Sequence, residues 1–249
     1  MPRYKLTIEY DGAGYAGWQR QDSAMSVQQA LEEAALALNE QPVAVIGAGR
    51  TDAGVHALGQ VAHIDLAKSL PAGRVRDALN AHLRPHPIAV LDAELAAPDF
   101  HARFDATARS YIYRIVNRRA DLALERHRAW RIATKLDAEA MNTAAQPLVG
   151  RHNFTTFRHV HCQADTPVKT LDRIRITRQL DAVIVETTAR SFLHNQVRSM
   201  VGSLVEVGRG RRPSHWIGDI LAAADRTLCG PVAPADGLYL ASVSYTPRS

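Results

Sequence analysis

One stretch of ten residues, Gly47 to His56, brings three glycines together with an arginine and an aspartate. Glycine lets the backbone bend tightly and approach a ligand closely. The cation, Arg50, and the carboxylate, Asp52, are two positions apart. A well-placed carboxylate can attack covalently or act as a base. This stretch is therefore the candidate centre of chemistry in the chain.

Two familiar phosphate-binding loops are excluded by their own requirements. A dinucleotide-binding fingerprint needs a third glycine at the position of Asp52, whose charge would repel a pyrophosphate. A Walker loop needs Gly-Lys followed by Ser or Thr, which does not occur here. One plain alternative stays open, in which the aspartate only accepts backbone hydrogen bonds within a turn.

The elements around this stretch indicate how it is held. The β-branched run from Val43 to Ile46 predicts a buried strand that ends at the stretch, and Gln60 to Asp65 predicts a strand after it. Alternating residues from Tyr4 to Tyr10 predict a first strand with one buried face. A capping box at Ser26 predicts a helix that runs to about Asn39. Strands and helices in this order favour an α+β layer design with helices on one face of a sheet.

The second half of the chain repeats this mixture of elements. The residues around Tyr111 and Tyr113 predict a strand, on which both rings are expected to point to the same side. Apolar residues from Leu193 to Val205 form the strongest helical stripe of the chain. Arg198 lies at the edge of that stripe, where its stem can follow the core while its guanidinium reaches an acid. The length suits two halves, with a boundary near Asp105.

Composition favours a folded protein that binds a polyanion. The 249 residues are 46% hydrophobic and carry 30 lysines and arginines against 25 acids, a net charge of +5. The basic stretch from Arg114 to Arg131 is either an RNA backbone contact or a solvated charged surface. With only Cys162 and Cys229, no disulfide framework is expected. No apolar run approaches the roughly 20 residues of a membrane span, so we expect a cytoplasmic protein.

The stretch from Gly49 to His56 resembles the signature of the tRNA pseudouridine synthase A family. Five further segments match motifs of that family in the same order: Tyr10-Asp11-Gly12, Gly17 to Gln21, Asp99 to Phe104, Ala108 to Tyr113 and Phe192 to Arg198. The resemblance therefore spans nearly the whole chain.

The resemblance implies a fold, a reaction and site residues. The expected fold is the pseudouridine synthase fold, with an N-terminal lobe at residues 1–105, a C-terminal lobe at residues 106–249 and the active cleft between them. The implied reaction converts uridine to pseudouridine at positions 38, 39 and 40 of the anticodon stem-loop of tRNA. Asp52 is then the nucleophile, Tyr111 the active-site tyrosine, Arg50 the support of the flipped nucleotide, and Arg198 the partner of the aspartate. Family members act as homodimers, and the reaction needs neither a cofactor nor a metal.

The chain departs from the common pattern of the family at one place. Many relatives have His-Met where this sequence has Asn195-Gln196, which keeps Arg198 but puts its support in question. Two other classes of protein are alternatives. A non-catalytic RNA-binding module would not need Asp52, and a nucleoside hydrolase would normally present two paired carboxylates.

Overall fold

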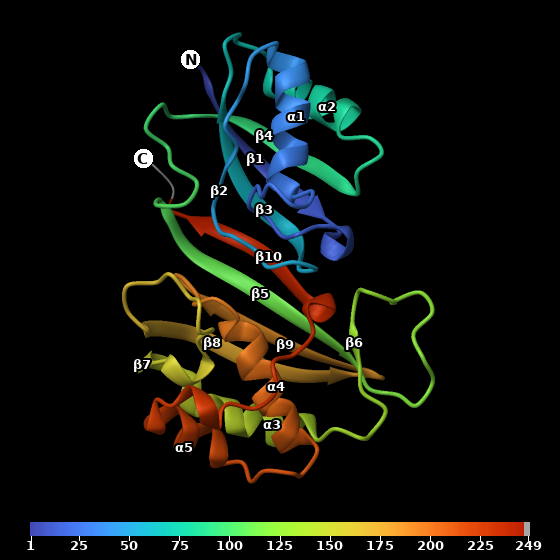
Figure 1. The fold of residues 1–249 in the computed structure, drawn as a ribbon, viewed down its shortest axis with the longest axis vertical. Coiled ribbons are helices and arrows are strands. Elements are labelled where there is room, and N and C mark those ends of the chain that lie inside the picture. The colour runs from blue at the N-terminus through green and yellow to red at the C-terminus, as the bar shows by residue number, and fades with distance from the viewer. Residues whose placement is uncertain (247–249) are drawn as a thin grey trace. The chain divides into compact units, whose positions relative to one another are not determined.

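The computed structural model describes residues 1–246, and their contacts divide into two compact units (Figure 1). Of the described residues, the first unit contains Met1–Thr107 and residues 239–246, and the second contains Ala108–Leu238. The chain passes from the first unit to the second after Thr107, close to the boundary expected near residue 105. The expected second half, residues 106–249, differs at its end, because the last strand returns to the first unit. This last strand, Leu238–Tyr245, returns because it pairs with the strand His56–Asp65 of the first unit.

A mixed sheet forms the centre of the first unit. Its strands have the order β4 (Ile88–Ala96), β1 (Arg3–Tyr10), β3 (His56–Asp65) and β10 (Leu238–Tyr245), and β2 (Ile46–Gly47) also pairs with β3. β1 is antiparallel to both of its neighbours, whereas β10 is parallel to β3, with Tyr239 opposite His56. The alternation predicted for β1 is confirmed, since Tyr4, Leu6 and Ile8 are buried.

Two helices, α1 (Val27–Asn39) and α2 (Ala72–His82), pack together on one face of this sheet (Figure 1). The predicted cap of α1 is present, because Ser26 Oγ accepts a hydrogen bond from the Gln29 amide at 3.1 Å. The apolar side of α1, including Ala30 and Leu31, is buried. The helix ends where Glu40 adopts the left-handed conformation, with φ of 60°.

The second unit has the same mixed composition. Its strands have the order β5 (Ala106–Val116), β9 (Ala182–Ala189), β8 (Val168–Gln179) and β7 (Gly150–Asn153), with β6 (Trp130–Arg131) beside β5. Its helices are α3 (Ala138–Ala145), α4 (Gln196–Gly208) and α5 (Trp216–Ala223). Short 3₁₀ turns occur at Gly12–Gly14, Gln146–Leu148, Thr155–Phe157, Arg226–Leu228 and Ala235–Gly237. The expected α+β class is therefore confirmed.

The apolar stripe predicted for α4 is buried along nearly its whole length, from Val197 to Val207. The helix begins later than the stripe suggests, at Gln196 rather than at Leu193. The preceding Asn195 has a φ of 61°, a left-handed conformation that an α-helix cannot include. The pattern of apolar residues alone does not reveal such a break.

Candidate active site

The loop that carries Arg50 and Asp52 connects β2 to β3, and its first residues are fixed to β3. The amide of Ala48 donates a hydrogen bond to Val61 O at 2.7 Å. The side chain of Gln60 is fully buried, and its Nε2 donates to Gly49 O at 2.8 Å. The loop therefore leaves the sheet from a rigid base.

The residue before the candidate catalytic aspartate is held from two sides. Thr51 is buried, and its hydroxyl lies 2.8 Å from the hydroxyl of Tyr10 at the end of β1. Its carbonyl accepts a hydrogen bond from the Trp18 amide at 3.0 Å. Asp52 itself is only half-buried, and its carbonyl accepts the amide of Val55 at 3.1 Å in a turn. The backbone at Asp52 is thus fixed, and the residue keeps part of its surface exposed.

Two glycines of the flanking motifs allow this close approach. A Cβ added to Gly12 would lie 2.0 Å from Val55 O, and one added to Gly17 would lie 2.6 Å from Thr51 O. Gly17 also has a φ of 100°, which other residues rarely adopt. Any larger side chain at either position would have to displace the loop. This packing explains why glycines far from Asp52 in the sequence belong to the same site.

His56 holds the far end of the loop, a role that the sequence analysis missed. The side chain is almost completely buried, and its ring stacks on that of Tyr239 at a centroid distance of 4.7 Å. Its Nδ1 accepts the Gly12 amide at 3.0 Å and lies 3.1 Å from Asp11 Oδ1. The sequence did contain a signal for this contact, because His56 and Asp11 each belong to one of the motifs on which the family resemblance rests.

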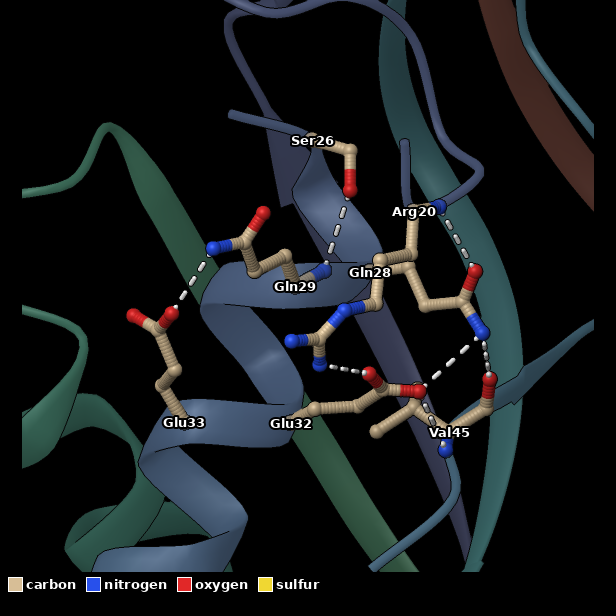
Figure 2. Close-up of polar contacts among 7 residues, drawn as sticks. All are labelled: Arg20, Ser26, Gln28, Gln29, Glu32, Glu33 and Val45. Carbon is tan, nitrogen blue, oxygen red and sulfur yellow. Dashed lines mark hydrogen bonds and ion pairs between the residues drawn. The ribbon is translucent and has the colours of Figure 1, made fainter. Parts of the chain in front are cut away.

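The segment before the loop is attached to α1 by side chains (Figure 2). We predicted a strand from Val43 to Ile46, but the strand contains only Ile46–Gly47. At Val45 the carbonyl accepts a hydrogen bond from Gln28 Nε2 at 3.1 Å, and the amide donates to Glu32 Oε1 at 3.5 Å (Figure 2). These helix side chains satisfy backbone groups that a neighbouring strand would otherwise satisfy.

In the second unit, Tyr111 lies on β5 opposite Thr187 of β9. Its half-buried ring meets the ring of Phe192 edge to face, with centroids 5.2 Å apart. Tyr113, two residues along the strand, is fully buried, and its hydroxyl donates to Pro234 O at 2.8 Å. Burial raises the pKa of Tyr113 well above its usual value. Of the two tyrosines, Tyr111 is therefore partly exposed, whereas Tyr113 is not.

Arg198 lies on the first turns of α4, with its guanidinium oriented by two acceptors. Its Nε donates to Ala233 O at 2.7 Å, and Nη1 donates to Asn195 Oδ1 at 3.1 Å. Gln196 Oε1 accepts the Leu193 amide at 2.8 Å. Of the two residues that depart from the family pattern, Asn195 therefore contacts the Arg198 guanidinium directly, whereas Gln196 binds the backbone just before the helix.

The predicted site residues are thus distributed over both units. Arg50 and Asp52 share one loop of the first unit, with Arg50 exposed. Tyr111 and Arg198 belong to the second unit. None of the helices in residues 1–246 is long and apolar enough to cross a membrane.

Comparison with known proteins agrees with these observations. The family model described as tRNA pseudouridine synthase matches residues 6–105 and 144–246. The tRNA pseudouridine synthase A of Afipia carboxidovorans is 65% identical over 245 residues, covering 98% of this chain and 100% of the relative. That of Maricaulis maris is 60% identical, covering 98% of each chain. A solved chain from a Cbf5-Nop10-Gar1 complex aligns with a TM-score of only 0.32 at 8% identity, over 81% of this chain and 54% of that one, and supports no conclusion. The family model and the two relatives show that the chain belongs to the tRNA pseudouridine synthase family.

Proposed function

We propose that this protein converts uridine to pseudouridine at positions 38, 39 and 40 in the anticodon stem-loop of tRNA, with Asp52 as the catalytic residue. Family membership makes the protein an isomerase that acts on uridine in tRNA. The choice of positions and the choice of Asp52 both rest on the motifs shared with the tRNA pseudouridine synthase A family, and the loop geometry supports the choice of Asp52.

The observation that carries the proposal is the fixed backbone around Asp52, a residue that keeps part of its surface exposed. Hydrogen bonds to Thr51 and at Val55 fix the backbone on both sides, and the residue as a whole is only half-buried. A carboxylate that is held in place before the substrate arrives loses little freedom in the reaction.

The reaction balances without an oxidant or an imported group. The N1–C1′ bond breaks, the uracil rotates, and a C5–C1′ bond forms. The proton on C5 leaves to solvent, and N1 takes up a proton. Asp52 serves either as a nucleophile or as a base at the sugar.

The other three residues receive and orient the nucleotide. A uridine in a stem-loop must leave its stack before it can react, which costs a few kcal/mol. The half-buried ring of Tyr111, fixed by the edge contact to Phe192, offers a surface on which uracil can stack. Arg50 is exposed and can support the flipped nucleotide, and Arg198 supplies a positive charge for the carboxylate.

The same resemblance leads us to propose a cytoplasmic homodimer in which one tRNA contacts both subunits. The net charge of +5 suits a long phosphate backbone. Light scattering of the purified protein with and without tRNA tests the subunit number.

The decisive experiment measures tritium release from tRNA transcripts labelled at C5 of uridine. We expect the wild type to release label and Asp52→Asn, which keeps the side-chain shape, to lose at least about a thousandfold in rate. Asp92→Asn, an exposed aspartate of β4 in the same unit, is the matched control and should behave as the wild type. Transcripts with cytidine at 38, 39 or 40 identify the modified positions.

Three outcomes would contradict the proposal. Binding of tRNA with no release of label by any variant would indicate an RNA-binding module. Free uracil among the products would indicate a hydrolase. Equal release by the wild type and Asp52→Asn would keep the reaction but exclude Asp52 as its catalytic residue.

A further inference from the structure

His56, the first residue of β3, is a polar side chain enclosed by the core of the first unit. It is 1% exposed, and its Nδ1 accepts the Gly12 amide at 3.0 Å. A ring that accepts at Nδ1 carries its hydrogen on Nε2. That nitrogen is buried, and no group in residues 1–246 forms a hydrogen bond with it. The imidazole therefore keeps one polar atom paired and one unpaired.

This arrangement is costly for stability. A buried N–H without an acceptor costs about 1–3 kcal/mol of folding free energy. Because buried groups of this kind are rare in native proteins, each calls for an explanation, and a role in the chemistry of a site is one of the known explanations. The paired nitrogen of His56 is the place to look for such a role, since it binds the backbone at Gly12.

Gly12 is in direct contact with the turn that follows Asp52. A Cβ added to Gly12 would lie 2.0 Å from Val55 O and 3.1 Å from Val55 N. The amide of Val55 in turn donates a hydrogen bond to Asp52 O at 3.1 Å. His56 thus fixes Gly12, Gly12 lies against Val55, and Val55 closes the turn on Asp52.

The last strand of the chain holds the imidazole itself in place. Tyr239 of β10 is opposite His56 in the sheet, and the two rings stack with centroids 4.7 Å apart and an interplanar angle of 22°. The Asp11 carboxylate lies beside the same ring, with Oδ1 3.1 Å from Nδ1. The imidazole therefore has little freedom to rotate away from the Gly12 amide.

We propose that His56 is a positioning residue for the isomerisation of uridine, which sets the place of Asp52 through Gly12 and the turn at Val55. An error of about 1 Å in the position of a reacting group can cost about a hundredfold in rate. His56 is buried and does not touch the RNA, so it acts on the rate and not on tRNA affinity. The inference rests on the proposed function, because it assumes that Asp52 is the catalytic residue.

The test compares two replacements of His56 that change stability and positioning in opposite ways. His56→Phe keeps a ring beside Tyr239 but leaves the Gly12 amide without an acceptor. His56→Asn loses the ring, which leaves a cavity, but its Oδ1 can take the place of Nδ1. We expect His56→Phe to release tritium about 10- to 100-fold more slowly than the wild type in single turnovers. We expect His56→Asn to unfold at lower urea and yet to stay within about fivefold of the wild-type rate.

Three further measurements separate positioning from a general loss of structure. Filter binding should give both variants the tRNA affinity of the wild type. His63→Phe is the matched control, because His63 is a second buried histidine of β3 whose Nδ1 accepts a backbone amide, that of Ala102, and it should keep the wild-type rate. If His56→Phe does not fold, His56→Gln takes its place, because its amide extends one bond beyond the position of Nδ1.

Three outcomes would overturn the positioning role. The first is a wild-type rate in His56→Phe. The second is a rate in His56→Asn at or below that of His56→Phe, because the rates would then follow stability. The third is a loss of tRNA affinity that accounts for the slower release.

Failure of the proposed function gives a different result in the same assay. If Asp52 is not catalytic, Asp52→Asn releases tritium like the wild type. If only the positioning role is wrong, Asp52→Asn still loses release while His56→Phe keeps the wild-type rate.

Discussion

At the scale of single residues, His63 shows how burial sets the charge of a side chain that holds the segment from Asp99 to Asp105 in place. The side chain is 5% exposed, and burial, together with Arg3 and His101, lowers its pKa from 6.5 to about 4. His63 is therefore neutral near pH 7, and its Nδ1 can accept the Ala102 amide. The histidine serves as a hydrogen-bond acceptor for that segment.

The lowered pKa of His63 predicts how stability depends on pH. The unfolded chain takes up a proton near pH 6.5 and the folded chain only near pH 4, so this contribution is complete above pH 6.5 and is lost as the pH falls toward 4. Within that window the free energy of unfolding should fall by at most about 1.4 kcal/mol per pH unit because of His63. His63→Asn, whose Oδ1 can accept the same amide, should lack this dependence.

Urea unfolding of both proteins at pH 7 and pH 5 checks the prediction. Every other titrating group is shared, so the difference between the two pH profiles isolates His63. Parallel profiles would show that the folded and unfolded chains bind a proton at His63 with equal affinity.

At the scale of elements, α1 supports the candidate catalytic loop through side chains on its first two turns. Glu32 joins three partners, because Oε1 accepts from Gln28 and Val45 and Oε2 forms an ion pair with Arg20 at 3.0 Å (Figure 2). Glu33 is the next residue but is exposed and contacts only Gln29 of its own helix in Figure 2. These neighbours form a matched pair for experiment.

We expect Glu32→Ala to lower the free energy of unfolding by about 1.5–3 kcal/mol, since it leaves the Val45 amide and Gln28 without a charged partner. Glu33→Ala should cost no more than about 0.5 kcal/mol, the value of a helix-surface pair. Chemical denaturation of the two variants beside the wild type provides the measurement. Equal losses would mean that the network around Val45 adds nothing to ordinary helix-surface contacts.

At the scale of the whole molecule, the basic stretch between β5 and β6 contains both paired and unpaired arginines. Arg118 forms an ion pair with Asp181 at 3.0 Å, and Arg131 lies 3.7 Å from Asp121. Within residues 1–246, the exposed side chains of Arg119 and Arg126 form no ion pair. Positive charges without an acidic neighbour remain available for phosphates.

Binding of tRNA should therefore weaken steeply with salt, and the slope should depend on these two arginines. Each phosphate contact contributes about 0.7–0.9 to the slope of log K against log salt. Replacing Arg119 and Arg126 by Gln should reduce the slope by up to about 2, whereas Arg74→Gln, on exposed α2 surface, should leave it unchanged. Titrations at several salt concentrations provide the slopes. A double variant with the wild-type slope would mean that the stretch is only a solvated surface.

The sequence by itself determined the class of fold, the main elements and the family. The spacing of apolar residues and helix capping depend only on neighbouring residues, so β1, α1 and the stripe of α4 could be predicted from their own residues. The motif from Gly49 to His56 likewise identified Asp52 as the candidate catalytic residue, because the types of its residues and their spacing are visible in the chain.

Only the tertiary structure decided what holds that motif in place. The contacts of His56 with Gly12 and Tyr239, of Thr51 with Tyr10, and of Val45 with α1 join residues far apart in the sequence. The return of β10 to the first unit is of the same kind. Once helices and strands have formed, the polar groups that still lack hydrogen bonds must find partners elsewhere in the chain. The sequence around each group does not show which distant residue will be that partner.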